Sequence, residues 1–340
     1  MHIKTSSYLL CSLLLLLACN EEQLLQEYDK DAPIHFTSKC IEVFTRVTGV
    51  INNNQLPANN QISLFSIQHL NESPAILWEP ELFNNTIGIA DKNGDILYDN
   101  TYYFPAGEQI DFFAVHPLIS STTTGSNYDG SNITTITLNE NTVDQYDLMY
   151  ASLLNQSKKS SLLVFEFQHL LTQITFNIIK AHNITIDLPL TKVQINASQS
   201  ATLDIWKGSL CNIQGEATYI LNTNTTLGTE ETLIPGQFLL FPQKATKMIL
   251  TFGNDGNNIF EVPLSGDPQT WEPGVNYQYN ITISRNIPES VSTETPVDNT
   301  ENTIVDNTPV DNETTTDPNN VAPVTKAITP NTVMVYRSID

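Results

Sequence analysis

Apolar and polar residues alternate over many short stretches of this chain between residues 34 and 286. The run Asn276–Ile283 is the clearest example, because every second residue in it is apolar. A period of two is the period of a strand with one buried face. No long segment has apolar residues at the three-and-four spacing of an amphipathic helix. The pattern therefore predicts an all-β fold built as two β-sandwich domains in tandem.

Two pairs of predicted strands have a turn signal between them. Asn93 and Gly94 stand between two apolar runs, and Gly253–Asn257 separates Met248–Phe252 from Ile259–Val262. Asn and Gly adopt the positive φ angles that tight hairpin turns require. Both segments are therefore predicted to be β-hairpins.

Polar segments divide the strand-rich region and end it. Residues 155–160 are polar and are interpreted as a domain boundary, which gives an N-terminal sandwich over residues 34–157 and a C-terminal one over residues 158–286. Residues 287–325 contain eight acidic residues and no Lys, Arg or aromatic residue. Such a segment cannot bury enough apolar area to offset its ordering entropy, so a disordered acidic linker is predicted. Strand-like alternation returns within residues 326–340.

The chain begins with the layout of an export signal. Residues 1–18 combine a short polar start with an apolar run that is too short to span a bilayer comfortably. The end of this run, Leu16-Leu17-Ala18-Cys19, resembles a bacterial lipobox, which implies cleavage before Cys19 and acylation of its thiol. The alternative is an ordinary secretory signal with a chance Cys. Residues 19–33 are then an acylated tether, and its first acidic residues fit either a surface-export signal or a solvated linker.

Composition narrows the range of partners. The 340 residues include 15 Lys and Arg against 37 Asp and Glu, so the formal net charge is −22. A field of that sign repels nucleic acid and anionic lipid. After the signal and Cys19, only Cys40 and Cys211 remain. They could form one disulfide, but their separation favours two small buried hydrophobic residues, and two lone Cys make a metal site less favoured still.

Motifs of catalysis are not found in the sequence. It has no Gly-rich phosphate loop, His-Glu-x-x-His helix or Gly-x-Ser-x-Gly turn. We therefore expect no enzyme, no metal and no cofactor apart from the covalent lipid on Cys19. A hydrolase with a dispersed triad stays open as a minor alternative. Asp91, Asn93 and Asp95 alternate like calcium ligands, but the required Gly and Glu positions hold Ile96 and Tyr102, so the hairpin interpretation is favoured.

Two further features have both a structural and a functional interpretation. His169 could be a ligand, but a buried His bonded to the backbone is favoured. A group of aromatic residues at strand spacing could form a sugar-binding platform, but a place in the core is favoured. This group consists of Tyr102, Tyr103, Phe104, Phe112 and Phe113.

Arg46 is one of only three Arg residues after the signal, and it ends the first predicted strand. A protease specific for Arg would release residues 20–46 together with the lipid. Removing a strand from a sandwich leaves an apolar groove with two unpaired edges, which is a site for a strand from another copy. A surface Arg at the end of a strand is the alternative.

These features together resemble the fimbrillin and fimbrillin-like (Mfa-like) lipoproteins of type V pili. The resemblance covers roughly residues 16–285. It rests on the order and spacing of several short motifs: the lipobox, Thr45-Arg46, Tyr103-Phe104-Pro105, Ile110–Pro117, Asp147–Ala151, Leu163–Leu171 and Asn276–Ile283.

The resemblance implies two transthyretin-like Greek-key sandwiches, lipidation at Cys19, processing after Arg46, and a C-terminal strand that fills a neighbouring subunit. Alternation in the last residues makes that strand a candidate donor, with Val333, Val335, Arg337 and Ile339 on one face. The acidic linker before it departs from the family pattern, so anchor, tip and stalk roles all stay open.

Two hypotheses about function follow. The first is a structural or adhesive pilus subunit that assembles by protease-triggered strand exchange, with other pilin subunits or its own copies as partners. The second is a non-polymerising surface lipoprotein that binds a glycan or a host protein. Both place the chain at the outer membrane, lipid-anchored or in a surface fimbrium.

Overall fold

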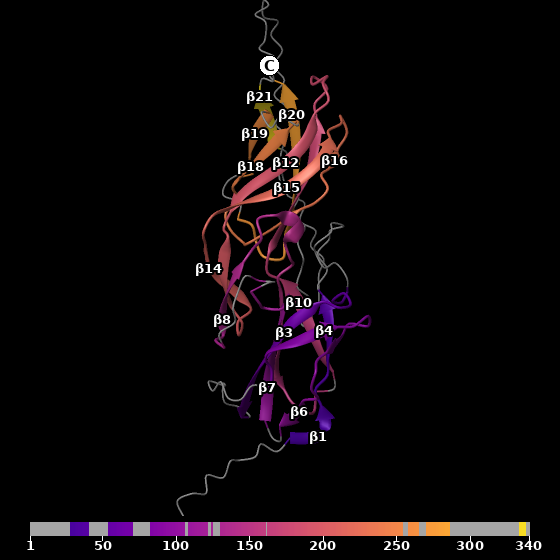
Figure 1. Cartoon of the computed structure of the whole chain (residues 1–340), viewed down its shortest axis with the longest axis vertical. Helices are drawn as coiled ribbons and strands as arrows, with labels where there is room; N and C mark the ends of the chain where they lie inside the picture. Colours follow the sequence, from indigo (N-terminus) through magenta and orange to yellow (C-terminus); the bar gives the residue numbers. More distant parts are fainter. Residues whose placement is uncertain are drawn as a thin grey trace, which may run out of the picture.

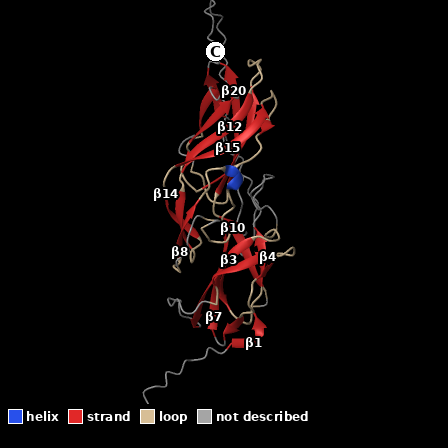
Figure 2. Ribbon diagram, viewed as in Figure 1, coloured by secondary structure: helices blue, strands red, loops and turns tan. Residues whose placement is uncertain are grey.

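The computed structural model describes residues 28–40, 54–70, 82–105, 108–121, 124, 130–160, 162–253, 258–264, 270–285 and 333–337. Within this part of the chain the protein is almost entirely strand, and the only helical element is the short 3₁₀ turn η1 (Thr142–Asp144). Figure 2 shows this turn near the middle of an elongated all-β molecule. The all-β fold class is therefore confirmed.

The first unit is a sheet of seven strands that closes on itself. The closed order is β10-β2-β5-β4-β3-β7-β9, so each of the seven strands pairs with a neighbouring strand on both of its sides. A separate antiparallel pair joins β1 (Tyr28–Pro33) to β6 (Tyr103–Pro105) at one end of the long axis (Figure 1). The seven strands are β2 (Phe36–Cys40), β3 (Gln61–Leu70), β4 (Asn84–Ala90), β5 (Asp95–Leu97), β7 (Glu108–His116), β9 (Met149–Gln156) and β10 (Leu163–His169).

The second unit is a sandwich of two sheets at the opposite end of the molecule (Figure 1). One sheet has the order β16-β11-β20-β21, with β17 also paired to β11, and the other has the order β15-β12-β18-β19. The strands of the first sheet are β16 (Thr232–Leu233), β11 (Thr172–Lys180), β20 (Asn276–Arg285), β21 (Val333–Arg337) and β17 (Phe238–Leu240). Those of the second are β15 (Ala217–Thr226), β12 (Pro189–Ala197), β18 (Lys247–Phe252) and β19 (Asn258–Pro263).

A third, smaller sheet joins the two units. It has the order β14-β13-β8, and its strands are β14 (Ser209–Gln214), β13 (Ser200–Asp204) and β8 (Ile133–Thr137). Strand pairing thus crosses the expected boundary at residue 157 in both directions. β10 lies after it and belongs to the first unit, whereas β8 lies before it and pairs with β13. The division into independent domains at that residue stays a prediction, and the last part of the expected tether forms β1.

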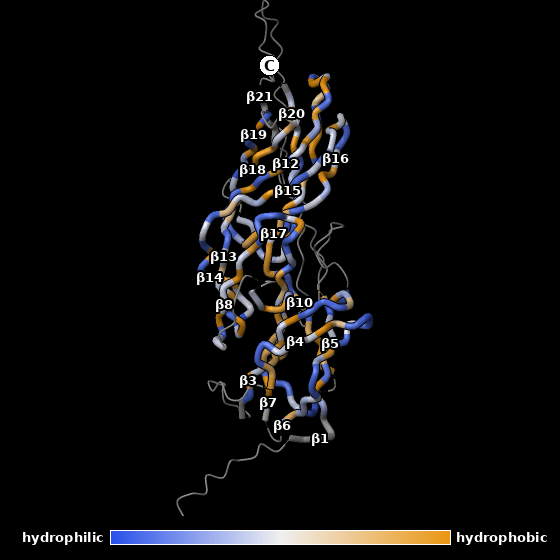
Figure 3. The backbone as a smooth tube through the Cα atoms, viewed as in Figure 1, coloured by the Kyte–Doolittle hydropathy of each residue, from blue (hydrophilic) through white to orange (hydrophobic). Residues whose placement is uncertain are grey.

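The buried side chains form two cores. The smaller one fills the closed sheet and includes Phe36, Phe112 and Phe165. The larger one fills the sandwich and reaches Phe113 and Val115 of the first unit. Successive residues of β7 therefore point into different cores, as the two-residue period of a strand requires. Figure 3 shows hydrophobic and hydrophilic stretches following one another along the strands.

The two pairs of strands that the sequence predicted as hairpins are antiparallel neighbours in the structure. β4 and β5 form the first predicted hairpin, in which Gly94 has a φ of +85° and Asp91 Oδ1 accepts the N–H groups of Asn93 and Asp95. This turn uses the Asp91 carboxylate and explains the alternation of Asp and Asn without a calcium ion. β18 and β19 form the second predicted hairpin.

The two cysteines differ from the expectation. Cys40 is buried, but Cys211 is exposed on β14, and both are free. The prediction of two buried cysteines was therefore wrong for Cys211, because β14 packs on the core through Leu210 and Ile213 and leaves Cys211 between them exposed.

Candidate functional site

The candidate site is the position of β2 within the closed sheet. β2 runs parallel to β10, with residue pairs from Leu163 with Phe36 to Phe167 with Cys40. Its other side pairs with β5 in antiparallel fashion over Phe36 and Thr37 only. β2 is thus held between two strands that are distant from it in sequence. Its removal would leave both neighbours with unpaired edges.

Phe36 anchors β2 in the core of the closed sheet, where only 2% of its surface is exposed. Its ring centroid lies 4.8 Å from that of Phe165, 4.9 Å from that of Phe112 and 5.6 Å from that of Phe83. The contacts are tilted or edge-to-face, which aromatic rings favour. A fourth ring, that of Tyr98, lies 6.1 Å away, and the Tyr98 hydroxyl donates a hydrogen bond to the carbonyl of Ile34.

Ser38 is the polar residue on the buried face of β2. Its hydroxyl donates to the carbonyl of Gly94 at 2.9 Å and accepts the backbone N–H of Leu56 at 3.2 Å. One hydroxyl therefore satisfies two backbone groups from two different loops. This arrangement matters because an unpaired buried polar group is destabilising.

The two faces of β2 differ sharply. Phe36, Ser38 and Cys40 point inward and are buried, and so is Ile34 just before the strand. On the outer face, the ammonium of Lys39 lies 3.0 Å from Glu166 Oε1 on β10 in an exposed ion pair. Burial, with a smaller contribution from the Asp147 charge, raises the pKa of the Cys40 thiol to about 12 and keeps it neutral.

A buried polar group lies where the closed sheet meets the sandwich. His169 Nδ1, at the end of β10, lies 2.9 Å from Asp147 Oδ1, and His116 Nδ1 lies 2.8 Å from the carbonyl of Asp147. His169 is thus buried as expected, but its partner is a carboxylate rather than the backbone. Burial lowers the pKa of His116, although Asp147 opposes this effect.

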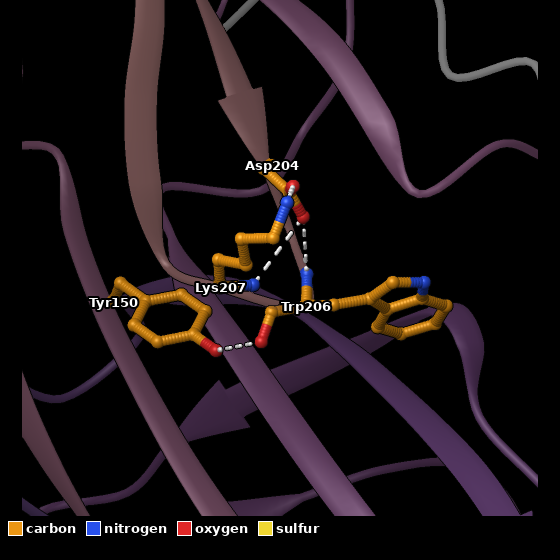
Figure 4. Close-up of polar contacts among 4 residues, drawn as sticks. All are labelled: Tyr150, Asp204, Trp206 and Lys207. Carbon is orange, nitrogen blue, oxygen red and sulfur yellow. Dashed lines mark hydrogen bonds and ion pairs between the residues drawn. The ribbon is translucent and has the colours of Figure 1, made fainter. Parts of the chain in front are cut away.

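A second polar contact joins the closed sheet to the small sheet β14-β13-β8 through the turn after β13. Figure 4 shows the Tyr150 hydroxyl of β9 donating to the carbonyl of Trp206 at 3.4 Å, while Asp204 Oδ1 accepts the Trp206 N–H and Asp204 Oδ2 pairs with Lys207 Nζ at 2.8 Å. The turn approaches the Tyr150 ring closely. A Cβ at Gly208, where φ is +62°, would lie 2.1 Å from that ring. The closed sheet is therefore fixed against its neighbour and does not hang on a free linker.

The structure describes only some of the site residues that the sequence predicts. Cys19, Arg46 and Ile339 lie outside the described residues, as does the linker 287–325. Val333, Val335 and Arg337 lie in β21, which pairs in parallel with β20 of the same chain, from Ile281 with Val333 to Arg285 with Arg337. β21, the candidate donor strand, and β2, whose place it would take, thus belong to opposite halves of the molecule (Figure 1).

Sequence reasoning missed three features of the site. It did not predict β10 as the partner of β2, the bridging role of Ser38, or the pairing of β21 with β20. The alternation of Ile34 and Phe36 with His35 did indicate the buried face at the start of this segment. The aromatic group was interpreted correctly for Phe104, Phe112 and Phe113, which are buried, whereas Tyr102 and Tyr103 are half-buried. In the described part of the chain, no helix has the length and apolarity needed to cross a membrane.

Comparisons with known proteins agree on one family. A family model described as "Fimbrillin-like" matches residues 45–317, which is well over half of the chain. A crystal structure of a proposed cell adhesion protein from Bacteroides uniformis ATCC 8492 aligns with a TM-score of 0.54 and 20% identity, over 74% of this chain and 93% of that one. A second, from Bacteroides ovatus ATCC 8483, aligns with a TM-score of 0.52 and 17% identity, over 75% and 92%. A search of curated proteins finds no significant match.

The fold and the site define a structural all-β protein in which the early strand β2 lies between two strands that are distant from it in sequence. The family match then decides the identity, and the chain belongs to the fimbrillin-like family. It is accordingly a subunit of the fimbrial or adhesin type and not an enzyme. The two solved structures share its fold.

Proposed function

We propose that this protein is a type V pilus subunit that is exported as a lipoprotein and assembles by strand exchange. Acylation of Cys19 would hold it at the outer membrane, cleavage after Arg46 would release β1 and β2 with the lipid, and residues 333–339 of a neighbour would take the place of β2. The observation that carries the proposal is the setting of β2. It lies between β10 and β5, and the slot that its removal would leave has two unpaired strand edges to which an incoming strand could pair.

The arrangement of the two ends supports assembly in trans. The slot belongs to the closed sheet, and β21 belongs to the far sandwich. A donor at one end and an acceptor at the other make a head-to-tail contact between different surfaces, which propagates into a filament unless rotation closes a ring. Outer-membrane anchoring and the surface fimbrium follow from the same proposal.

Limited proteolysis tests the proposal directly. Treatment with an Arg-specific protease should give a chain that begins at Val47, as read by mass spectrometry, and a ladder of multimers. The Arg46→Lys variant keeps the charge but not the cleavage site, so it should stay monomeric. Deletion of residues 326–340 should leave the cleavage intact and abolish the ladder. A chain that is cut at Arg46 but stays monomeric with its tail present would refute polymerisation.

The pairing of β21 with β20 favours a second candidate function. A tail that is occupied within its own chain suits a non-polymerising surface lipoprotein that binds a glycan or a host protein. Such a protein would bind saturably in its uncleaved form, which a glycan array measures. An empty array together with multimer formation would eliminate this candidate.

A further inference from the structure

The donor segment offers two different faces to the slot, and the lining of the slot distinguishes them. By the alternation of the sequence alone, an extended strand has Met334, Tyr336 and Ser338 on one face and Val333, Val335 and Arg337 on the other; Ser338 lies outside the described residues. The face that enters must replace the buried residues of the released segment, which are Ile34 just before β2 and Phe36, Ser38 and Cys40 within it.

We propose that the Met334, Tyr336 and Ser338 face enters the slot, with Met334 at the position of Ile34, Tyr336 at that of Phe36 and Ser338 at that of Ser38. This inference rests on the strand exchange proposed above and deepens it by assigning the register and the residues that determine specificity. Alternation in the sequence indicated the face with Val333 and Val335 as the candidate donor face, whereas this inference places the opposite face inward.

The central position calls for an aromatic ring. Loss of Phe36 would leave a space bounded by Phe83, Phe112 and Phe165, whose centroids lie 4.8 to 5.6 Å from that of Phe36. Tyr336 is the only aromatic residue in the last fifteen residues of the chain. The opposite face would bring a valine to this position, which underfills the space.

The next inward position calls for a hydroxyl. The Leu56 N–H and the Gly94 carbonyl both use the Ser38 hydroxyl, so the departure of β2 leaves the Leu56 N–H without this acceptor. Ser338 returns a hydroxyl to the same place when Tyr336 takes the place of Phe36. In the opposite orientation this position receives Arg337, and burying its guanidinium without a carboxylate partner is strongly unfavourable.

The outer face gives an independent check on the register. Thr37 of β2 lies opposite Asp95 of β5. In the proposed register Arg337 takes the position of Thr37, so its guanidinium faces the half-exposed Asp95 across the strand pair. Opposite charges at directly paired positions on one face of a sheet are favourable.

Multimer formation by the full chain after Arg-specific cleavage tests the register. Tyr336→Ala should slow ladder formation on the order of 100-fold, as the loss of a buried ring from a packed core does. Ser338→Ala should slow it about tenfold, in line with the loss of a hydrogen bond to a buried group. Val333→Thr and Val335→Thr are matched controls on the other face and should assemble like the wild type.

Charge reversal separates register from general damage to the tail. Arg337→Glu should slow assembly, because a glutamate would face Asp95. Combining Arg337→Glu with Asp95→Lys should restore the wild-type rate, which a general defect in the tail cannot explain. Rescue together with tolerance at Val333 and Val335 supports the inference.

Other outcomes overturn it. If the valine variants fail while Tyr336→Ala and Ser338→Ala assemble normally, the opposite face enters, and strand exchange stands without this register. Equal loss in all variants, or no rescue by charge reversal, refutes the register as well. If cleaved wild-type protein forms no multimers, strand exchange and the register fail together.

Discussion

Replacing Phe36 with Ala tests how β2 is held and whether it leaves. The ring is buried against three other phenylalanine rings and Tyr98. Truncation of a buried Phe to Ala costs about 3–5 kcal/mol. At about 1.4 kcal/mol for each factor of ten, the slot should open at least roughly 100-fold more often. Chemical denaturation of the uncleaved chain should show the full loss of stability.

The same substitution should have no effect on the assembled product. Residue 36 leaves with the released segment, so multimers from cleaved Phe36→Ala protein should melt at the same temperature as wild-type multimers. They should also form faster, because the weakened strand leaves sooner. Lys39→Ala is the matched control, since its exposed ion pair with Glu166 is worth about 0–1 kcal/mol.

Two results would refute this reasoning. A loss below about 1 kcal/mol in uncleaved Phe36→Ala protein would mean that the ring does not fill a packed core. A change in the melting temperature of the multimers would mean that β2 stays in the product, which excludes strand release.

Three further predictions concern the same region. Ser38→Ala should lower the unfolding free energy of the uncleaved chain by about 1–3 kcal/mol, measured by urea denaturation, because it leaves a buried backbone N–H without its partner. At pH 8 a thiol reagent should label exposed Cys211 but not buried Cys40. The pKa of Cys40 is about 12, so only about one Cys40 thiol in ten thousand is ionised at that pH. Labelling of Cys40 in the native chain would contradict its burial. The pKa of His116 is lowered in the folded chain, so the unfolded chain takes up a proton first as the pH falls. The contribution of neutral His116 to stability is therefore present above about pH 6.5 and is lost below it. A urea midpoint that does not fall between pH 7 and 5 would argue against a neutral buried imidazole.

The sequence by itself determined the class of fold and many of its local elements. A two-residue period shows which residues of a strand are buried, so Ile34 and Phe36 could be assigned to the core. Asn93 and Gly94 encode their turn locally, because the positive φ of Gly94 is a property of a single residue. Short motifs in a fixed order indicated the family, which the match over residues 45–317 confirms.

Only the tertiary structure decided which strands are neighbours and what that makes of single residues. Glu166 lies 127 positions after Lys39 yet pairs with it, because the choice of a partner strand depends on how the whole core is filled and not on local sequence. Ser38 carries no signal that separates it from a surface serine. Its role exists only where the loops at Leu56 and Gly94 meet β2, since a hydrogen-bonding requirement is created by burial and burial is created by the fold.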